Sequence, residues 1–180
     1  MTVDRFEIEG LLLIKPAVFS DERGLFYETY SSNKYSAYGI PTSFMQDNES
    51  ISKKNVLRGL HFQSPPHDQG KLVRVIKGAA IDVAVDIRKQ SPTYGKYIMV
   101  ELSEENKFQF WIPSGFAHGF LSLTDETIFS YKCTNLYNKE SESGLLWNDK
   151  DINIQWNIEN PIVSEKDIQL APFNSFNSPF

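Results

Sequence analysis

A regular alternation of side chains runs through Ile81-Asp82-Val83-Ala84-Val85-Asp86-Ile87, in which the odd positions are apolar and the even positions are polar or small. A period of two is the period of a β-strand, because successive side chains point to opposite faces of a sheet. We therefore predict a strand over these residues that is buried on one face only.

The segments on either side of this stretch carry the same kind of signal. Leu72–Ile76 comes just before it, and Lys77-Gly78 lies at the junction, which predicts a β-hairpin. Three further segments are rich in residues that favour strands: Leu25–Tyr30, Phe108–Ile112 and Thr127–Cys133.

Helical signals are few. Ser31-Ser32 predicts the start of one short helix over residues 33–38, which Gly39 ends. Many short strands with close turns favour an all-β fold, an antiparallel sandwich or barrel of the jelly-roll kind. Barrels of this kind often hold a ligand between their inward-facing side chains.

Length and composition exclude several classes of protein. The 180 residues suit a single domain, residues 1–180, and the Asn- and Ser-rich end, residues 173–180, is typical of a tail or a surface strap. One cysteine cannot form an internal disulfide, which favours a cytoplasmic location. A net charge of −5 argues against general nucleic-acid binding. The longest early apolar run, Leu11–Ile14, is too short for a membrane span.

Two of the three histidines lie in patterned surroundings. Pro113, Gly115 and His118 have the spacing of the second cupin motif, and the place of the first motif reads His61-Phe62-Gln63. Metal-binding cupins have a second histidine where this chain has Gln63. A metal site usually needs three or four nitrogen, oxygen or sulfur ligands, so we predict no metal here. A lone histidine is most often a structural imidazole, but two in matching positions favour a functional role.

Seven motifs stand in one order along almost the whole chain: Arg58-Gly59-Leu60-His61-Phe62-Gln63, Lys71-Leu72-Val73-Arg74-Val75, Asp82-Val83-Ala84-Val85-Asp86-Ile87-Arg88, Ser91-Pro92-Thr93-Tyr94-Gly95, Ile112 to Phe120, Tyr131-Lys132-Cys133-Thr134 and Ser164-Glu165-Lys166-Asp167. This order resembles the dTDP-4-dehydrorhamnose 3,5-epimerases. The resemblance implies a cupin-type jelly roll (a double-stranded β-helix) with short flanking helices, no cofactor and a homodimer. It also implies inversion of C3 and C5 of dTDP-4-dehydro-6-deoxy-D-glucose to give dTDP-4-dehydro-L-rhamnose.

The resemblance assigns four catalytic roles. His61 resembles the base, because a neutral imidazole accepts a proton near pH 7, and Asp167 resembles the carboxylate that orients it. Tyr131 resembles the acid that returns a proton from the opposite face. Lys71 resembles the group near the C4 oxygen, where an enolate develops charge. Without the motif match, Tyr131 would be taken as one of eight tyrosines and Asp167 as a solvated carboxylate.

The resemblance also assigns a binding site for the rest of the ligand. Arg23 and Arg58 match the diphosphate contacts, for which arginine has the suitable bidentate geometry. Phe26 and Tyr137 are candidates for stacking on the thymine ring. The other positions that match substrate contacts are Glu28, Gln46, Asp47, Asn48, His118, Glu142 and Lys166. In the family, the segment that carries Arg23 and Glu28 often reaches the neighbouring subunit's pocket.

One departure and several alternatives bear on specificity. Ser143 stands where many members of the family have arginine, which removes a possible charge contact near the pocket. An epimerase that acts at C3 or C5 alone, a 3,4-ketoisomerase of a related nucleotide sugar and a non-catalytic cupin that binds a nucleotide sugar all fit parts of the pattern. A base and an acid on opposite faces of the sugar favour epimerisation over the ketoisomerase and the non-catalytic cupin.

Overall fold

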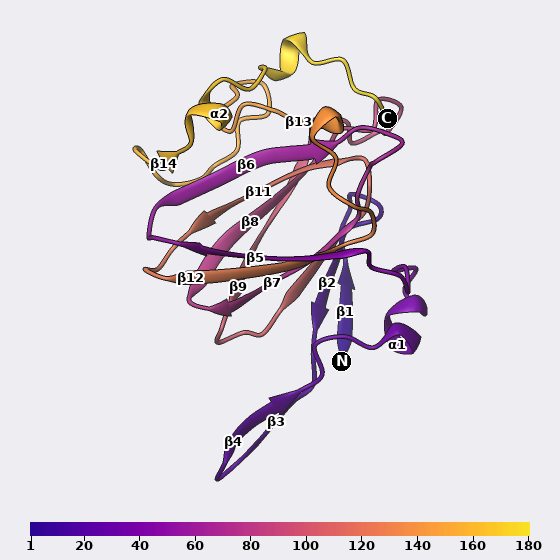
Figure 1. Ribbon diagram of the computed structural model, residues 1–180, viewed down its shortest axis with the longest axis vertical. Helices are drawn as coiled ribbons and strands as arrows, with labels where there is room; N and C mark the ends of the chain where they lie inside the picture. The colour runs from indigo at the N-terminus through magenta and orange to yellow at the C-terminus, as the bar shows by residue number, and fades with distance from the viewer.

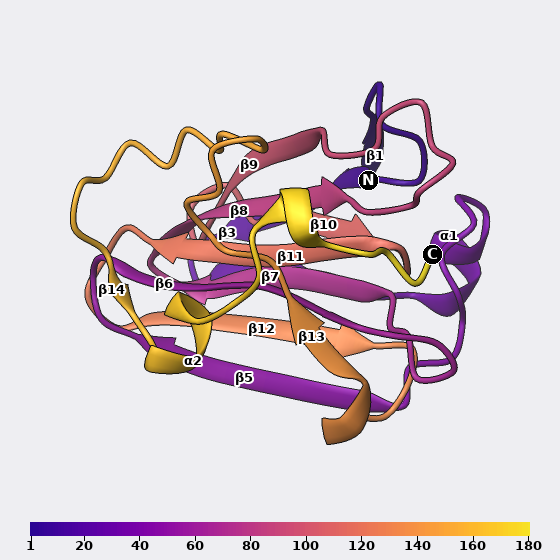
Figure 2. The same cartoon turned by 90° about the horizontal axis from the view of Figure 1, so that it is seen from above.

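The computed structural model describes residues 1–180 and shows two β-sheets that face each other (Figure 1, Figure 2). The first sheet has the order β1 (Thr2–Arg5), β2 (Leu12–Lys15), β10 (Gln109–Ile112), β7 (Lys71–Lys77), β12 (Thr127–Cys133), β5 (Gln46–Ser52). The second has the order β13 (Glu142–Gly144), β6 (Val56–Gln63), β11 (Phe116–Ser122), β8 (Ala79–Asp86), β9 (Tyr97–Ser103), with β14 (Ile162–Val163) parallel to β6. All other pairings between strands of the two sheets are antiparallel, and the predicted all-β jelly roll is confirmed.

A separate two-stranded hairpin, β3 (Val18–Asp21) and β4 (Gly24–Tyr27), projects from the body of the molecule (Figure 1). The helices are short: α1 (Ser32–Ser36), α2 (Glu165–Ile168) and the single 3₁₀ turns η1 (Lys139–Ser141) and η2 (Phe173–Ser175). The helix predicted after Ser31 is therefore present, but the Ser31 side chain makes no capping hydrogen bond. No helix has the length and apolarity that crossing a membrane requires.

The hairpin predicted at Lys77-Gly78 is wrong. β7 pairs with β10 and β12, whereas β8 pairs with β11 and β9 of the other sheet. Gly78 has a φ of 79° and lies where the chain crosses between the sheets. A glycine between two strands indicates a sharp change of direction, but it does not tell whether the second strand pairs with the first or leaves its sheet.

The prediction that residues 81–87 are buried on one face only is also wrong. Both faces of β8 are covered. Val83 and Val85 pack on the outer side, while Asp82 and Ala84 are fully buried on the inner side. The polar positions of the alternation therefore point between the two sheets and not to solvent.

The space between the sheets is partly core and partly cavity. Phe120 of β11 and Phe129 of β12 stack at 4.0 Å between ring centroids and fill the middle of the barrel together with Val73 and Phe110. The polar face of β8 lies beside this apolar filling.

The C-terminal segment covers the outside of the second sheet (Figure 2). Trp156 is buried there against the strands, and Phe176 and Phe180 meet the ring of Phe62 edge-on at 5.6 and 6.0 Å between centroids. The Lys89 N–H donates to the Phe180 carbonyl at 3.0 Å. The end of the chain thus lies across the sheet as a strap that contacts the apolar face of β6 and β8.

Candidate active site

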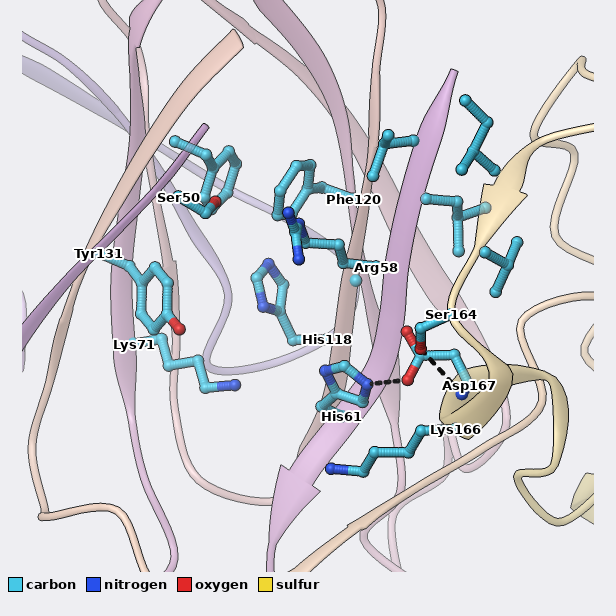
Figure 3. Close-up of a pocket in the computed structure, with 16 residues that line it drawn as sticks. Ser50, Arg58, His61, Lys71, His118, Phe120, Tyr131, Ser164, Lys166 and Asp167 are labelled. Atoms are coloured by element: carbon cyan, nitrogen blue, oxygen red, sulfur yellow. Dashed lines mark hydrogen bonds and ion pairs between the residues drawn. The ribbon is translucent and has the colours of Figure 1, made fainter. Parts of the chain in front are cut away.

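A cavity of about 540 Å³ opens between the two sheets. Its walls come from β5, β7 and β12 on one side and from β6, β11 and the α2 segment on the other (Figure 3). The polar side chains that line it are Ser50, Arg58, His61, Lys71, His118, Tyr131, Ser164, Lys166 and Asp167.

His61 and Asp167 form a close pair, although 106 positions separate them in the chain. His61 Nε2 lies 2.6 Å from Asp167 Oδ1, and the second carboxylate oxygen accepts from the Gly59 N–H at 3.2 Å. Burial alone would raise the pKa of Asp167, but its hydrogen bonds with His61, Gly59 and Ser164 bring this pKa below its ordinary value. An ionised Asp167 accepts a hydrogen bond from Nε2–H of the neutral imidazole of His61, and in this tautomer Nδ1 is the basic nitrogen.

The α2 helix brings Asp167 to this position. The Ser164 hydroxyl accepts from the Asp167 N–H at 3.1 Å and caps the helix, as serine commonly does at an N-terminus. Asp167 is 3% exposed, so the helix places its carboxylate against β6 and out of solvent.

Tyr131 and Lys71 reach into the cavity from the side opposite His61 (Figure 3). They lie on adjacent strands, and Lys71 Nζ is 6.0 Å from the centre of the Tyr131 ring. Burial raises the pKa of the Tyr131 hydroxyl and lowers the pKa of the Lys71 ammonium. The phenol is therefore protonated at neutral pH and has a proton to give.

A second histidine–aspartate pair lies beside the first. His118 of β11 is directly opposite His61 of β6, and its Nε2 is 2.9 Å from Asp82 Oδ2. Burial lowers the pKa of His118, and the nearby Asp82 only partly offsets this. Asp82 Oδ1 is buried and has no hydrogen-bond partner.

Two glycines allow the strands that carry these histidines to approach closely. A Cβ on Gly59 would lie 2.6 Å from the Gly119 Cα, and Gly59 has a φ of 133°. No larger residue fits there, so the Arg58-Gly59-Leu60-His61 motif and the Gly119 that follows His118 have a physical reason to contain glycine.

An outer pocket of about 310 Å³ shares His61, Lys71 and Tyr131 with the cavity. Tyr137 and Glu142 line it, and the Tyr137 hydroxyl donates to Glu142 Oε2 at 2.9 Å. Lys166 Nζ lies 2.6 Å from the same oxygen. Burial alone would raise the pKa of Glu142, but the Lys166 and Tyr137 hydrogen bonds lower it, so this carboxylate is ionised.

The other substrate-binding candidates divide into two groups. Arg58 lines the cavity, and Gln46 and Asn48 line the outer pocket from the inward face of β5. Asp47 alternates with them, points away from the cavity and pairs with Lys132 at 2.8 Å.

Arg23, Phe26 and Glu28 do not reach the cavity of their own chain. Arg23 and Phe26 lie on the projecting hairpin, where Phe26 is 73% exposed and Arg23 pairs with Asp21. Glu28 follows the hairpin and pairs with Lys34 at 2.8 Å. The single chain therefore leaves these three candidates outside the site.

Ser143 does not bear on the pocket as the sequence suggested. It is exposed on β13 between Glu142, which lines the outer pocket, and the buried Gly144. Because side chains alternate along a strand, Ser143 points away from the pocket, and an arginine at this position would do so too.

Sequence reasoning overlooked Asp82, Ser164 and the role of Gln63. The alternation around Asp82 gave no signal of this kind, because it predicted a solvent-facing side; only the covering of both faces of β8 requires a partner for this carboxylate inside. The structure contains no cluster of three or more His, Cys, Asp or Glu side chains arranged to hold a metal ion.

Comparison with known proteins identifies the family. The sequence model of the dTDP-4-dehydrorhamnose 3,5-epimerase family matches residues 5–175. The chain belongs to this epimerase family. It is 54% identical over 174 residues to the dTDP-4-dehydrorhamnose 3,5-epimerase of Shigella flexneri, and the match covers 96% of each chain.

Solved structures of epimerases have the same fold. A dTDP-6-deoxy-D-glucose-3,5-epimerase from Legionella pneumophila, in complex with dTDP-4-keto-L-rhamnose, superposes with a TM-score of 0.93 at 46% identity and covers 98% of this chain and 94% of its own. A 3′-monoepimerase from Streptomyces bikiniensis, in complex with dTDP-quinovose, has a TM-score of 0.90 at 30% identity and covers 94% and 87%. Epimerases that differ in the carbons they invert therefore have one fold, and the fold alone does not distinguish them.

Proposed function

We propose that this chain is a 3,5-epimerase that converts dTDP-4-dehydro-6-deoxy-D-glucose to dTDP-4-dehydro-L-rhamnose. The observation that carries the proposal is the pair His61–Asp167 on one wall of the cavity with Tyr131 and Lys71 on the opposite wall (Figure 3). Inversion at carbon needs a base on one face of the sugar and an acid on the other, and these side chains stand in that relation.

The reaction uses the C4 ketone, which acidifies the protons on C3 and C5. His61 takes the proton from one of these carbons, and the electron pair of the C–H bond moves onto the C4 oxygen as an enolate. The Lys71 ammonium stabilises that negative charge. The Tyr131 hydroxyl then gives a proton to the opposite face of the carbon, and the ketone reforms. Tyr131 and His61 recover their starting protonation from solvent, so no atom or electron is gained or lost and the proposal needs no cofactor.

The nucleotide half of the ligand extends toward the outer pocket. Arg58 and Lys166 supply positive charge for the two phosphates, which a net charge of −5 does not supply. Gln46, Asn48, Tyr137 and Glu142 supply polar and aromatic contacts for the ribose and the base.

We further propose a homodimer in which the hairpin of each chain completes the pocket of the other. Phe19 and Phe26 are opposite each other on the hairpin and are 65% and 73% exposed. Exposed aromatic side chains on a projecting arm are typical of a contact with another chain. A second copy would cover them and bring Arg23 and Glu28 to the neighbouring site. We expect one domain, residues 1–180, and a cytoplasmic location, in keeping with a single free cysteine.

Solvent exchange tests the proposal directly. Incubation with dTDP-4-dehydro-6-deoxy-D-glucose in D₂O should place deuterium at both C3 and C5, as read by NMR of the product. Exchange at C3 alone would make this chain a 3-epimerase, as the monoepimerase relative allows. A carbonyl that moves from C4 would identify a ketoisomerase, and binding of the sugar nucleotide without exchange would identify a non-catalytic cupin.

Tyr131→Phe serves as the variant that separates the two half-steps. It keeps the His61–Asp167 pair and removes the proton donor on the opposite wall. We expect proton removal and C–H washout to continue while inversion at C5 falls about 100-fold. Equal inversion at C5 in this variant and the unchanged protein would remove Tyr131 from the mechanism.

A further inference from the structure

Gln63 is buried, and its amide is fully engaged by backbone groups. The side chain is 5% exposed, and its Nε2 donates to the carbonyls of His67 at 2.6 Å and Leu136 at 3.2 Å. Its Oε1 accepts from the Asn138 N–H at 2.7 Å. Both N–H groups are thus used, and the carbonyl oxygen has one backbone partner, so the amide is committed to the loop around Tyr137.

Two of these bonds hold the residues on either side of Tyr137. Leu136 and Asn138 bind Gln63, and the Tyr137 N–H itself donates to Gln46 Oε1 at 2.8 Å. Three consecutive backbone positions in a loop are therefore held by two glutamine side chains. We call Gln46 and Gln63 together the glutamine clamp.

The side chain that this clamp positions does not belong to the core. Tyr137 is 53% exposed and lines the outer pocket. Burial of its ring thus contributes little to the stability of the fold. The clamp chiefly fixes the position in which the ring and hydroxyl would contact a ligand in the outer pocket.

The clamp is also linked to the His61–Asp167 pair through a series of contacts. The Tyr137 hydroxyl binds Glu142, Glu142 binds Lys166, and Lys166 precedes Asp167 on α2. Gln63 lies two residues after His61 on the same face of β6, and it is opposite Glu142 on β13.

We propose that Gln63 is a positioning residue for recognition of the nucleotide: it fixes Tyr137, and through it Glu142 and Lys166, as a preformed outer wall of the site. The place that holds a metal ligand in other cupins here holds a side chain that orders the wall against which the nucleoside diphosphate binds. This inference rests on the proposed function in one respect, because the ligand is taken to be a dTDP-linked sugar.

The test compares Gln63→Met, which keeps the length of the side chain and loses every hydrogen bond, with Gln109→Met as the matched control. Gln109 is 1% exposed and its Nε2 donates to a loop carbonyl, that of Thr29, at 2.8 Å, but it lines neither the cavity nor the outer pocket. Binding of dTDP alone is measured by calorimetry, and backbone exchange at residues 137 and 138 by hydrogen–deuterium exchange. In Gln63→Met we expect dTDP affinity to fall about tenfold and the Asn138 amide to lose protection. In Gln109→Met we expect dTDP affinity and protection of the Asn138 amide each to change less than about twofold.

Steady-state kinetics and a double variant distinguish positioning from general destabilisation. In Gln63→Met, KM should rise about tenfold while kcat changes less than about threefold. In a Tyr137→Ala background, Gln63→Met should weaken dTDP binding little further, because the residue it positions is gone. If Gln63→Met does not fold, Gln63→Asn keeps an amide that is too short to reach both sides of Tyr137, and its dTDP affinity should fall several-fold.

Three results would overturn the inference: unchanged dTDP affinity in the folded Gln63 variants, an equal loss in Gln109→Met, or fully additive effects with Tyr137→Ala. The dTDP and exchange measurements do not need turnover. A chain that binds dTDP through the clamp but gives no deuterium exchange in the sugar would therefore refute the proposed reaction and leave this inference standing.

Discussion

The two histidine–aspartate pairs resemble each other in geometry and differ in setting. His61 and His118 lie opposite each other on adjacent strands, with carboxylates at 2.6 and 2.9 Å. The His61 side chain is 31% exposed in the cavity, whereas the His118 side chain is 8% exposed. Asp167 lies on a capped helix and its carboxylate has two hydrogen-bond partners, whereas Asp82 lies within a strand and its carboxylate has one. Both imidazoles line the cavity, but only that of His61 is substantially exposed, which suits it for the proposed role of base, whereas His118 is suited to a buried polar contact.

Removal of each imidazole should give the largest difference between the two pairs, measured as deuterium incorporation into the sugar. We expect His61→Ala to lower deuterium incorporation at C3 and C5 by about 10³-fold, because no other base faces the sugar from that wall. His118→Ala should lower it only about tenfold through loss of a sugar contact. Comparable losses in the two variants, measured by NMR under the same conditions, would remove the distinction between the pairs.

Neutralisation of each carboxylate should give the next largest difference between the two pairs, measured as kcat. Asp167→Asn keeps the shape of the side chain but takes away the charge that orients His61, and we expect kcat to fall about 100-fold. Asp82→Asn should lower kcat less than about tenfold, since its partner is not the base. Circular dichroism confirms folding in both cases, and a larger effect at Asp82 would reverse the assignment.

Acid stability should depend on the buried pair. Because burial lowers the pKa of His118, the unfolded chain binds more protons than the folded one just below the ordinary histidine pKa of about 6.5. The free energy of unfolding should therefore fall as the pH is lowered from about 6.5 through the depressed pKa of His118. His118→Gln, whose amide can still donate to Asp82, should flatten this slope in thermal melts. Asp167, with its lowered pKa, acts in the same direction but only at lower pH, near the carboxyl range.

The smallest expected effect concerns the helix that holds Asp167. Ser164→Ala removes the hydroxyl that caps α2 and should cost about 1 kcal/mol of stability, with a loss of kcat of a few-fold. Ser114→Ala, whose hydroxyl donates to Asp68 elsewhere in the fold, is the control for loss of a serine hydrogen bond. An unchanged kcat in Ser164→Ala would mean that the Asp167 position does not depend on the cap.

Local patterns predicted the strands well and their partners badly. The prediction for Thr127–Cys133 matches β12 to the residue, because β-branched and aromatic side chains dominate that segment. The alternation over residues 81–87 correctly gave a strand, but its covering on the second face comes from Trp156 and the C-terminal strap, far away in sequence. Pairing across Gly78 failed for the same reason, because partners in a jelly roll are distant along the chain.

The site residues divide in the same way between what local patterns predict and what only long-range contacts determine. Spacing says nothing about a contact between His61 and Asp167, and only the resemblance of whole motifs brought them together. The same resemblance placed Arg23 and Glu28 in a pocket that their own chain does not let them reach. The position of Ser143 on the outer face of β13 follows from strand alternation, but only once the strand and its register are known.

Asp167 follows His61 by 106 positions in the chain, and this separation has a consequence for synthesis. Every strand of the first sheet, and every strand of the second except β14, has been made by Gly144, whereas the carboxylate that orients His61 is residue 167 of 180. During translation from the N-terminus, the histidine is therefore made about a hundred residues before its partner. A chain that terminates prematurely after β13 would carry the proposed base and acid but would lack the orienting carboxylate and the α2 wall of the cavity. The proposed catalytic pair is thus completed only after every strand of the first sheet has been made.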